Sequence, residues 1–158
     1  MKRRSLLTAV AVALPLSVFS ASLAAQPTIK SVAGTYSAVS VSAFGDNPRG
    51  QMILTPSGRY SIVVGRAKLS PVAAGARNKG TDAENKALVD GSISHFGKYT
   101  IDDGGKAITF HVEMSSFPNW DGKPQKRPLK VTKDTLTYTV LTPSNATAPA
   151  DVIWKRVK

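Results

Sequence analysis

The sequence consists largely of short segments rich in β-branched residues, which alternate with clusters of turn-forming residues at regular intervals. This pattern is typical of an antiparallel sandwich or barrel. We expect eight strands, over residues 32–42, 51–55, 59–64, 98–101, 107–115, 127–132, 135–141 and 151–157. Eight strands joined in succession are able to close into a barrel, which removes exposed sheet edges and leaves an interior for side chains or one small ligand.

One short helix interrupts the strands. Thr81 and Glu84 form a capping box, and Ala83, Ala87 and Leu88 follow at helical spacing, which predicts a helix near residues 82–90. The pattern also allows this helix to continue to His95 and Phe96 and to end at Gly97. The predicted fold class is therefore all-β: an eight-stranded antiparallel up-and-down barrel with one short helix.

The N-terminal 25 residues have the features of an export signal. Lys2, Arg3 and Arg4 precede an uncharged apolar run over 6–23, and small residues end at Ala25. We expect cleavage between Ala25 and Gln26, which leaves a single barrel domain over 26–158 in the periplasm or outside the cell. The run is long enough for an uncleaved membrane helix, but Pro15 and the small residues favour a cleaved signal. The arginine pair also resembles a twin-arginine signal.

Charge and composition narrow the classes of partner. The chain has 21 Lys and Arg against 10 Asp and Glu, and removal of three basic residues with the signal lowers the net charge from +11 to +8. No block of five or six like charges occurs, so we expect no nucleic-acid partner and no stable membrane insertion. With no Cys and only two His, we also expect no metal and no cofactor.

Several motifs, taken in order, resemble the bacterial and fungal lipocalin-like domain family, whose members form calycin-type barrels. The resemblance covers residues 31–158. It implies an eight-stranded lipocalin-like barrel with a ligand-sized cavity, and catalysis in some fungal relatives. The matching motifs are Gly34-Thr35-Tyr36, Asn47-Pro48-Arg49-Gly50, 55–61, His95-Phe96-Gly97-Lys98-Tyr99, 111–120, Gln125-Lys126-Arg127 and Trp154-Lys155-Arg156.

The resemblance also implies a structural role for three of these residues. Lipocalins pack an aromatic residue of the first strand under an arginine of the last strand, where the cation lies over the ring face. Tyr36 takes the place of the usual Trp, and Trp154 and Arg156 complete the set. We therefore expect these three side chains to plug one end of the barrel.

His111 and Glu113 are the candidate catalytic residues. Strand alternation places Thr109, His111, Glu113 and Ser115 on one face of segment 107–115, and the apolar residues, Met114 among them, on the other. If the polar row faces the cavity, the pair is suited to general acid–base chemistry or to orienting a polar ligand. The alternative is that this row faces solvent, as is usual for a half-buried strand.

Five further residues are candidate ligand contacts. Arg59 and Arg127 would act as anion clamps or as partners of Glu113, with a surface position as the alternative. Tyr60 and Tyr99 would supply phenol donors or serve as half-buried packing residues. Trp120 lies in a loop framed by Pro and Gly that is able to cover a barrel mouth. His95 is expected to serve as a cation at the helix C-terminus or to lie on the surface.

These observations predict an exported protein that binds a small, mostly apolar or amphipathic molecule in the barrel cavity. The alternative is an isomerase or cyclase that uses His111 and Glu113 on a small molecule. A third hypothesis is an envelope interaction module whose basic exterior binds anionic surfaces.

Overall fold

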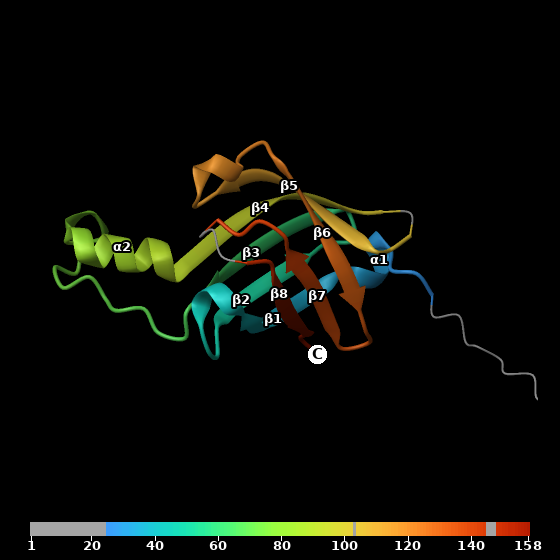
Figure 1. Cartoon of the computed structure of the whole chain (residues 1–158), viewed down its shortest axis with the longest axis horizontal. Coiled ribbons are helices and arrows are strands. Elements are labelled where there is room, and N and C mark those ends of the chain that lie inside the picture. The colour runs from blue at the N-terminus through green and yellow to red at the C-terminus, as the bar shows by residue number, and fades with distance from the viewer. Residues whose placement is uncertain (1–24, 103, 145–147) are drawn as a thin grey trace, which may run out of the picture.

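The computed structural model describes residues 25–102, 104–144 and 148–158, and within these ranges the eight predicted strands form a closed antiparallel barrel. Each strand pairs with the next in sequence order, and the last pairs with the first (Figure 1). The predicted fold class is thus confirmed. All but Ala25 of the predicted signal lies outside the described residues. The strands are β1 Gly34–Val41, β2 Arg49–Leu54, β3 Arg59–Gly65, β4 Ser92–Ile101, β5 Ala107–Ser115, β6 Pro124–Val131, β7 Thr135–Val140 and β8 Ala150–Arg156.

The described residues contain two short α-helices where the sequence predicts one. Helix α2, Asp82–Gly91, has the predicted capping box between Thr81 and Glu84. Its predicted continuation to residues 95–96 is wrong, because β4 already begins at Ser92. Helix α1, Ile29–Val32, was not expected, because four residues are too few to show helical periodicity. Three short 3₁₀ segments complete the elements: η1 Ser42–Phe44, η2 Arg77–Lys79 and η3 Pro118–Trp120.

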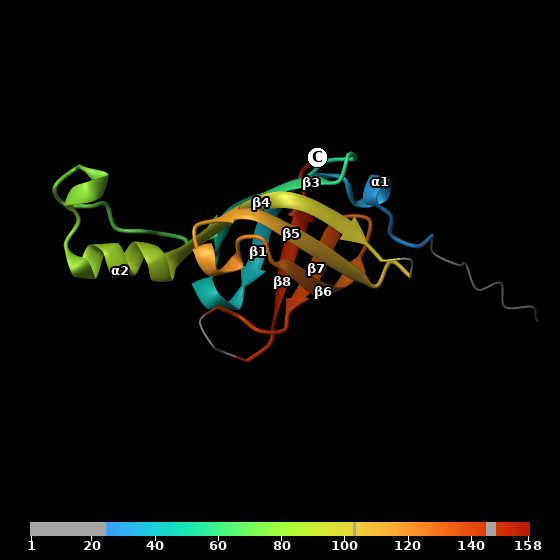
Figure 2. The same ribbon diagram turned by 90° about the horizontal axis from the view of Figure 1, so that it is seen from above.

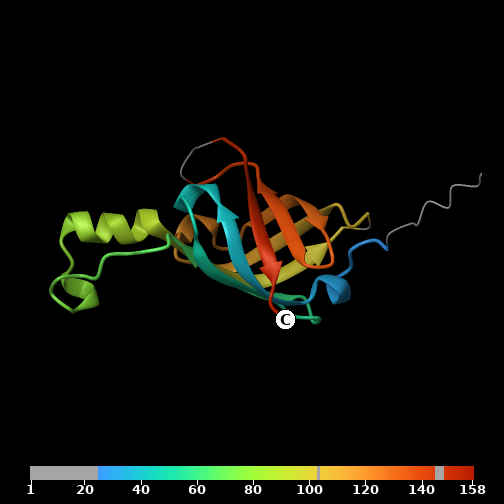
Figure 3. The same cartoon turned by 90° about the horizontal axis from the view of Figure 1, so that it is seen from below.

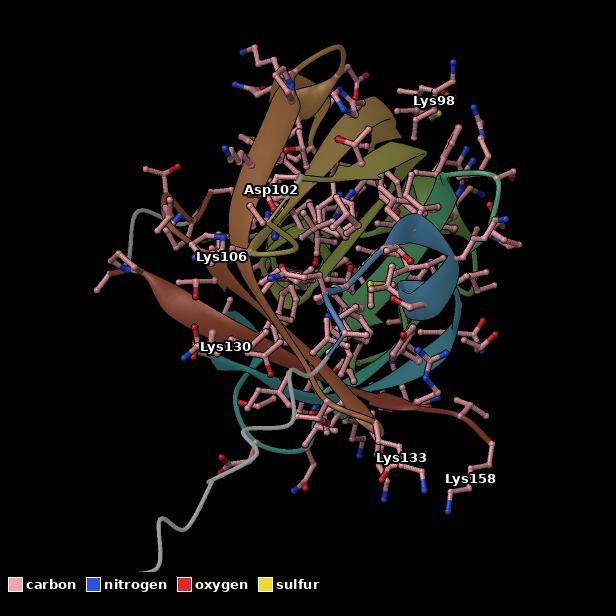
Figure 4. All side chains as sticks on the ribbon, turned by 90° about the vertical axis from the view of Figure 1, so that its right-hand side faces the viewer. Lys98, Asp102, Lys106, Lys130, Lys133 and Lys158 are labelled. Atoms are coloured by element: carbon pink, nitrogen blue, oxygen red, sulfur yellow. The ribbon has the colours of Figure 1, made fainter. Side chains whose placement is uncertain are left out.

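Helix α1 lies across one end of the barrel, which we call the closed end (Figure 4). Its Val32 is fully buried, and the Val32 carbonyl accepts a hydrogen bond from the Tyr36 hydroxyl at 2.6 Å. Arg156 lies over the Tyr36 ring, with its Cζ atom 4.8 Å from the ring centroid, and Trp154 is fully buried nearby in β8. The predicted plug of Tyr36, Trp154 and Arg156 is therefore present. The labelled lysines around this end point outward (Figure 4).

The opposite end, which we call the open end, is shaped by connections rather than by a cap. The chain between β3 and β4 leaves the barrel, forms η2 and α2, and returns, so that α2 projects beyond the strands (Figures 1, 2 and 3). Segments η1 and η3 lie at the same end (Figure 1). None of the helices in the described ranges is long and apolar enough to cross a membrane.

The register between β4 and β5 shifts where Phe96 faces Met114 and Gly97 faces Val112, which leaves Glu113 as the extra residue of a β-bulge in β5. Up to Val112, β5 alternates as predicted, with Ile108, Phe110 and Val112 buried in the barrel. Beyond it the pattern reverses, so Met114 is 59% exposed and Ser115 is buried. A bulge places two residues opposite one and so turns the following side chains to the other face. Gly97 suits this position, because a Cβ there would collide with the His111 backbone.

Candidate ligand-binding cavity

A cavity of about 470 Å³ opens at the open end of the barrel. This volume is within the usual range for a small-molecule site, about 300–1,000 Å³. Its deeper wall comes from the inner faces of the strands, and its mouth comes from η1, α2, η3 and the start of β4. The apolar side chains of the lining include Phe44, Ile62, Val64, Leu88, Ile93, Phe117, Val140 and Val152.

Arg127 is the basic residue of the cavity wall. It lies on β6, where alternation turns it inward between the exposed Lys126 and Pro128, and only 4% of its surface is exposed. Its Cζ atom lies 5.0 Å from the ring centroid of Tyr138, 5.6 Å from that of Phe110 and 5.8 Å from that of Trp120. The guanidinium is thus surrounded by aromatic rings inside the barrel.

The polar contacts of Arg127 are few. Its Nη2 atom donates one long hydrogen bond, 3.3 Å, to Gln125 Oε1. Within the described part of the chain, no Asp or Glu oxygen lies within 4 Å of it. Arginine carries its charge at all relevant pH values, and burial of an unpaired charge is unfavourable. This cation therefore lacks the acidic partner that a buried arginine normally has.

A neutral hydrogen-bonded pair, His95 and Tyr60, lies beside Arg127. His95 Nδ1 is 2.8 Å from the Tyr60 hydroxyl oxygen, and the imidazole is edge-on to Trp120 at 5.5 Å. Burial, followed by the charge of Arg127, lowers the pKa of His95 to about 3. Burial likewise raises the pKa of Tyr60 well above its usual value, although Arg127 opposes the shift. Both side chains are therefore neutral at physiological pH.

The remaining ionisable groups of the cavity leave its charge positive. Burial raises the pKa of Tyr138, which lines the wall as a neutral phenol. Asp90 lies at the mouth, where its carboxylate accepts a hydrogen bond from Lys86 Nζ at 2.7 Å. Among the described residues, the lining thus presents one cation, neutral polar groups and a mostly apolar wall.

His111 and Glu113 do not line the cavity, and of the two orientations left open for this row the solvent-facing one is present. Both side chains are exposed on the outer face of β5, because the inward positions before the bulge belong to Phe110 and Val112. Glu113 pairs with Arg59, with oxygen–nitrogen distances of 2.7 and 2.9 Å. The predicted Arg59–Glu113 contact thus exists, but on the outside of the barrel.

The other predicted contacts are divided between the two ends. Trp120 and Arg127 line the cavity, and Tyr60 lies behind His95. Tyr99 belongs to the closed end, where its hydroxyl donates toward the carbonyl oxygens of Thr55 and Ile29, at 2.8 and 3.1 Å. Tyr99 therefore lies away from the cavity, and its position does not support the predicted ligand contact.

His95 was not expected in the cavity. Because β4 begins at Ser92 rather than at residue 98, His95 shares the inner face with Gly97 and Tyr99, and it is 4% exposed. The sequence signal that would have identified it is the alternate spacing of Ile93, His95 and Tyr99, which share one face if the strand is extended back from Tyr99. Among the described residues, no cluster of three or more His, Asp or Glu side chains is arranged to hold a metal.

Comparison with known proteins agrees with this architecture. The lipocalin-like domain model matches residues 30–157, which span the whole barrel and most of α1. No curated protein matches the sequence significantly.

Proposed function

The chain belongs to the lipocalin-like domain family, and on that premise we propose that it binds one small, mostly apolar molecule in the cavity at the open end of the barrel. The observation that carries this proposal is the contrast within the barrel interior. Side chains fill the closed end, whereas about 470 Å³ at the open end is not filled. Burial of apolar ligand surface there would contribute about 25 cal/mol per Å².

The polar groups of the cavity would orient the ligand. Arg127 and the His95–Tyr60 pair are held by surrounding aromatic rings, so they occupy defined positions before a ligand enters. Preorganised polar groups in an apolar pocket contribute specificity more than affinity. The isomerase or cyclase alternative required His111 and Glu113 beside the ligand, and their outward orientation removes that basis.

A fluorescent probe and two neighbouring substitutions test the proposal. N-phenyl-1-naphthylamine, a neutral apolar probe, should bind with enhanced fluorescence. Val64→Phe places a larger side chain in the cavity and should weaken this binding by about tenfold or more, since it removes space that the probe needs. Val63→Phe is the matched control, because Val63 is 59% exposed on the outer face of the same strand.

Three outcomes are informative. Loss of probe binding in Val64→Phe with retention in Val63→Phe supports the cavity. Equal binding by both variants contradicts it. Absence of probe binding, together with binding to anionic vesicles that falls steeply with salt, would instead favour the basic exterior as the functional surface.

We also propose that the protein acts after export, because residues 1–25 have the features of a cleaved signal. The intact mass of protein recovered from its native host tests this. A chain that begins at Gln26 supports export, and a chain that retains Met1 or Lys2 contradicts it.

A further inference from the structure

The donors of Arg127 point to the chemistry of the ligand. A guanidinium has five N–H donors in its plane, and aromatic rings around its faces accept none of them strongly. Its protein acceptors are Gln125 Oε1, at 3.3 Å, and the hydroxyl of Tyr138, whose pKa burial raises and a hydrogen bond from Arg127 lowers. Among the described residues that are not exposed, Trp154 Nε1 is the only side-chain N or O atom that lacks both a partner and solvent contact. The remaining Arg127 donors are therefore open to the cavity rather than sealed in protein.

The charge of the cavity favours an anion. Arg127 is buried and its charge has no acidic partner in the described chain, while His95, Tyr60 and Tyr138 are neutral around it. The carboxylate nearest the mouth, Asp90, is bonded to Lys86. An anionic ligand would thus supply the partner that the protein leaves out.

The form of the site favours a carboxylate over a phosphate. A carboxylate has one charge and two coplanar oxygens, which match the two parallel N–H groups of a guanidinium. A phosphate dianion would leave one charge unpaired among Phe110, Trp120 and Tyr138, in a cavity whose other walls are apolar. The apolar walls then require an apolar body on the same molecule.

We propose that the ligand is an apolar carboxylic acid, whose carboxylate pairs with the Arg127 guanidinium while its hydrocarbon part fills the rest of the cavity. This inference rests on the proposed function and specifies its ligand class. Trp120, which contacts the guanidinium and the His95 ring, would lie against the head group.

Displacement of N-phenyl-1-naphthylamine by matched ligands tests the inference in the unaltered protein. Decanoate and decanol share a chain length and differ in the head group, and at about pH 8 the acid is fully ionised. Decanoate should bind at least about 30-fold more tightly than decanol, as expected for a buried charge pair. Naphthalene-1-carboxylate and naphthalene-1-methanol repeat the comparison with a rigid ring, which distinguishes chain acids from aromatic acids.

Substitutions assign the preference to Arg127. Arg127→Met should abolish the preference for the acid while decanol and the probe still bind. Arg127→Lys should retain part of it, because lysine keeps the charge but not the paired geometry. Lys126→Met, which removes an exposed charge from the neighbouring position on β6, should change the affinity for decanoate by less than about twofold.

The outcomes separate this inference from the proposed function. If the probe and decanol bind but neither acid is preferred over its alcohol, the acid-headed ligand is excluded and cavity binding stands. If an acid is preferred equally in Arg127→Met, Arg127 is excluded as its partner. If the probe does not bind the unaltered protein, the proposed function itself fails. The comparison of acid and alcohol needs no variant, so it tests the preference for an acid even if Arg127→Met does not fold.

Discussion

The two ends of the barrel each place an arginine over aromatic rings, and the two arginines differ in what their N–H groups contact. At the closed end, Arg156 lies over Tyr36 and donates to the carbonyl oxygens of Ala33, at 2.7 Å, and Ser31, at 3.0 Å. At the open end, Arg127 lies among three rings, donates a 3.3 Å bond to Gln125 and contacts the Tyr138 hydroxyl. The N–H donors of Arg156 thus bond to backbone carbonyls of the chain itself, whereas Arg127 retains N–H donors that are available to a ligand.

This difference separates stability from binding. The closed end joins α1, β1 and β8 through Val32, Tyr36 and Arg156, so each of these groups contributes to the folded state. The open end keeps a cavity and a buried cation, both of which reduce stability in the free protein. Substitutions at the closed end should therefore mainly lower stability, whereas substitutions at the open end should mainly change ligand binding.

The largest effect is expected from an aromatic residue of the closed end. Tyr36→Ala removes a fully buried ring and its hydrogen bond to Val32, and should lower the free energy of unfolding by about 3–5 kcal/mol. Trp120→Ala, at the half-buried rim of the cavity, should lower it by about 1 kcal/mol or less. Urea denaturation of both variants measures the difference. Similar losses in the two would show that both ends are equally structural.

The two arginines provide a second contrast in stability. Arg156→Met removes the donors to Ala33 and Ser31 and should lower the free energy of unfolding by about 2–4 kcal/mol. Arg127→Met replaces an unpaired buried charge by an apolar chain of similar length, and should change stability by less than about 1 kcal/mol in either direction. Chemical denaturation without ligand measures both values. A loss in Arg127→Met as large as that in Arg156→Met would assign Arg127 to the structure rather than to a ligand.

The buried imidazole of the open end should give the protein an acid-sensitive stability. The pKa of His95 is about 3 in the folded protein and near 6.5 in an unfolded chain, so between these values the unfolded state binds a proton that the folded state does not. This contribution is fully present above about pH 6.5, and about 1.4 kcal/mol is lost for each pH unit below it.

His95→Gln should flatten this dependence, because the amide is able to bond to Tyr60 but does not titrate. The chain has one other histidine, so His111→Gln, on the outer face, is the matched control and should keep the slope of the unaltered protein. Denaturant midpoints from about pH 7 to 4 provide the measurement. Parallel curves for His95→Gln and the unaltered protein would contradict the placement of His95.

Features that depend on residues close together in the sequence were predicted correctly, whereas features that depend on contacts between distant segments were not. Strand alternation and turn residues are local, and they located all eight strands and the α2 cap. The closure of the barrel decides which face of β5 is buried, and the bulge at Glu113 that reverses the pattern at Met114 is visible only in the pairing of β5 with β4. His95 was misplaced because the helix pattern overlapped the start of β4, where local signals for the two elements compete. Arg127 and Trp120 were selected by residue type, but their shared cavity is a property of the closed barrel.

The smallest effect is expected outside the barrel, at the pair that the sequence suggested for catalysis. Glu113 and Arg59 are paired at 2.7 Å, with 39% and 46% of their side chains exposed. Exposed ion pairs contribute about 1 kcal/mol or less, because water already solvates both charges and salt screens them. Glu113→Gln should therefore lower stability by at most about this amount, and should leave the affinity for N-phenyl-1-naphthylamine unchanged, since the wall of β5 separates this side chain from the cavity. A probe titration of Glu113→Gln beside Val64→Phe checks both statements. A marked loss of probe affinity in Glu113→Gln would place the ligand on the outer face of β4 and β5, and the contrast between the two ends would then no longer describe where this protein binds.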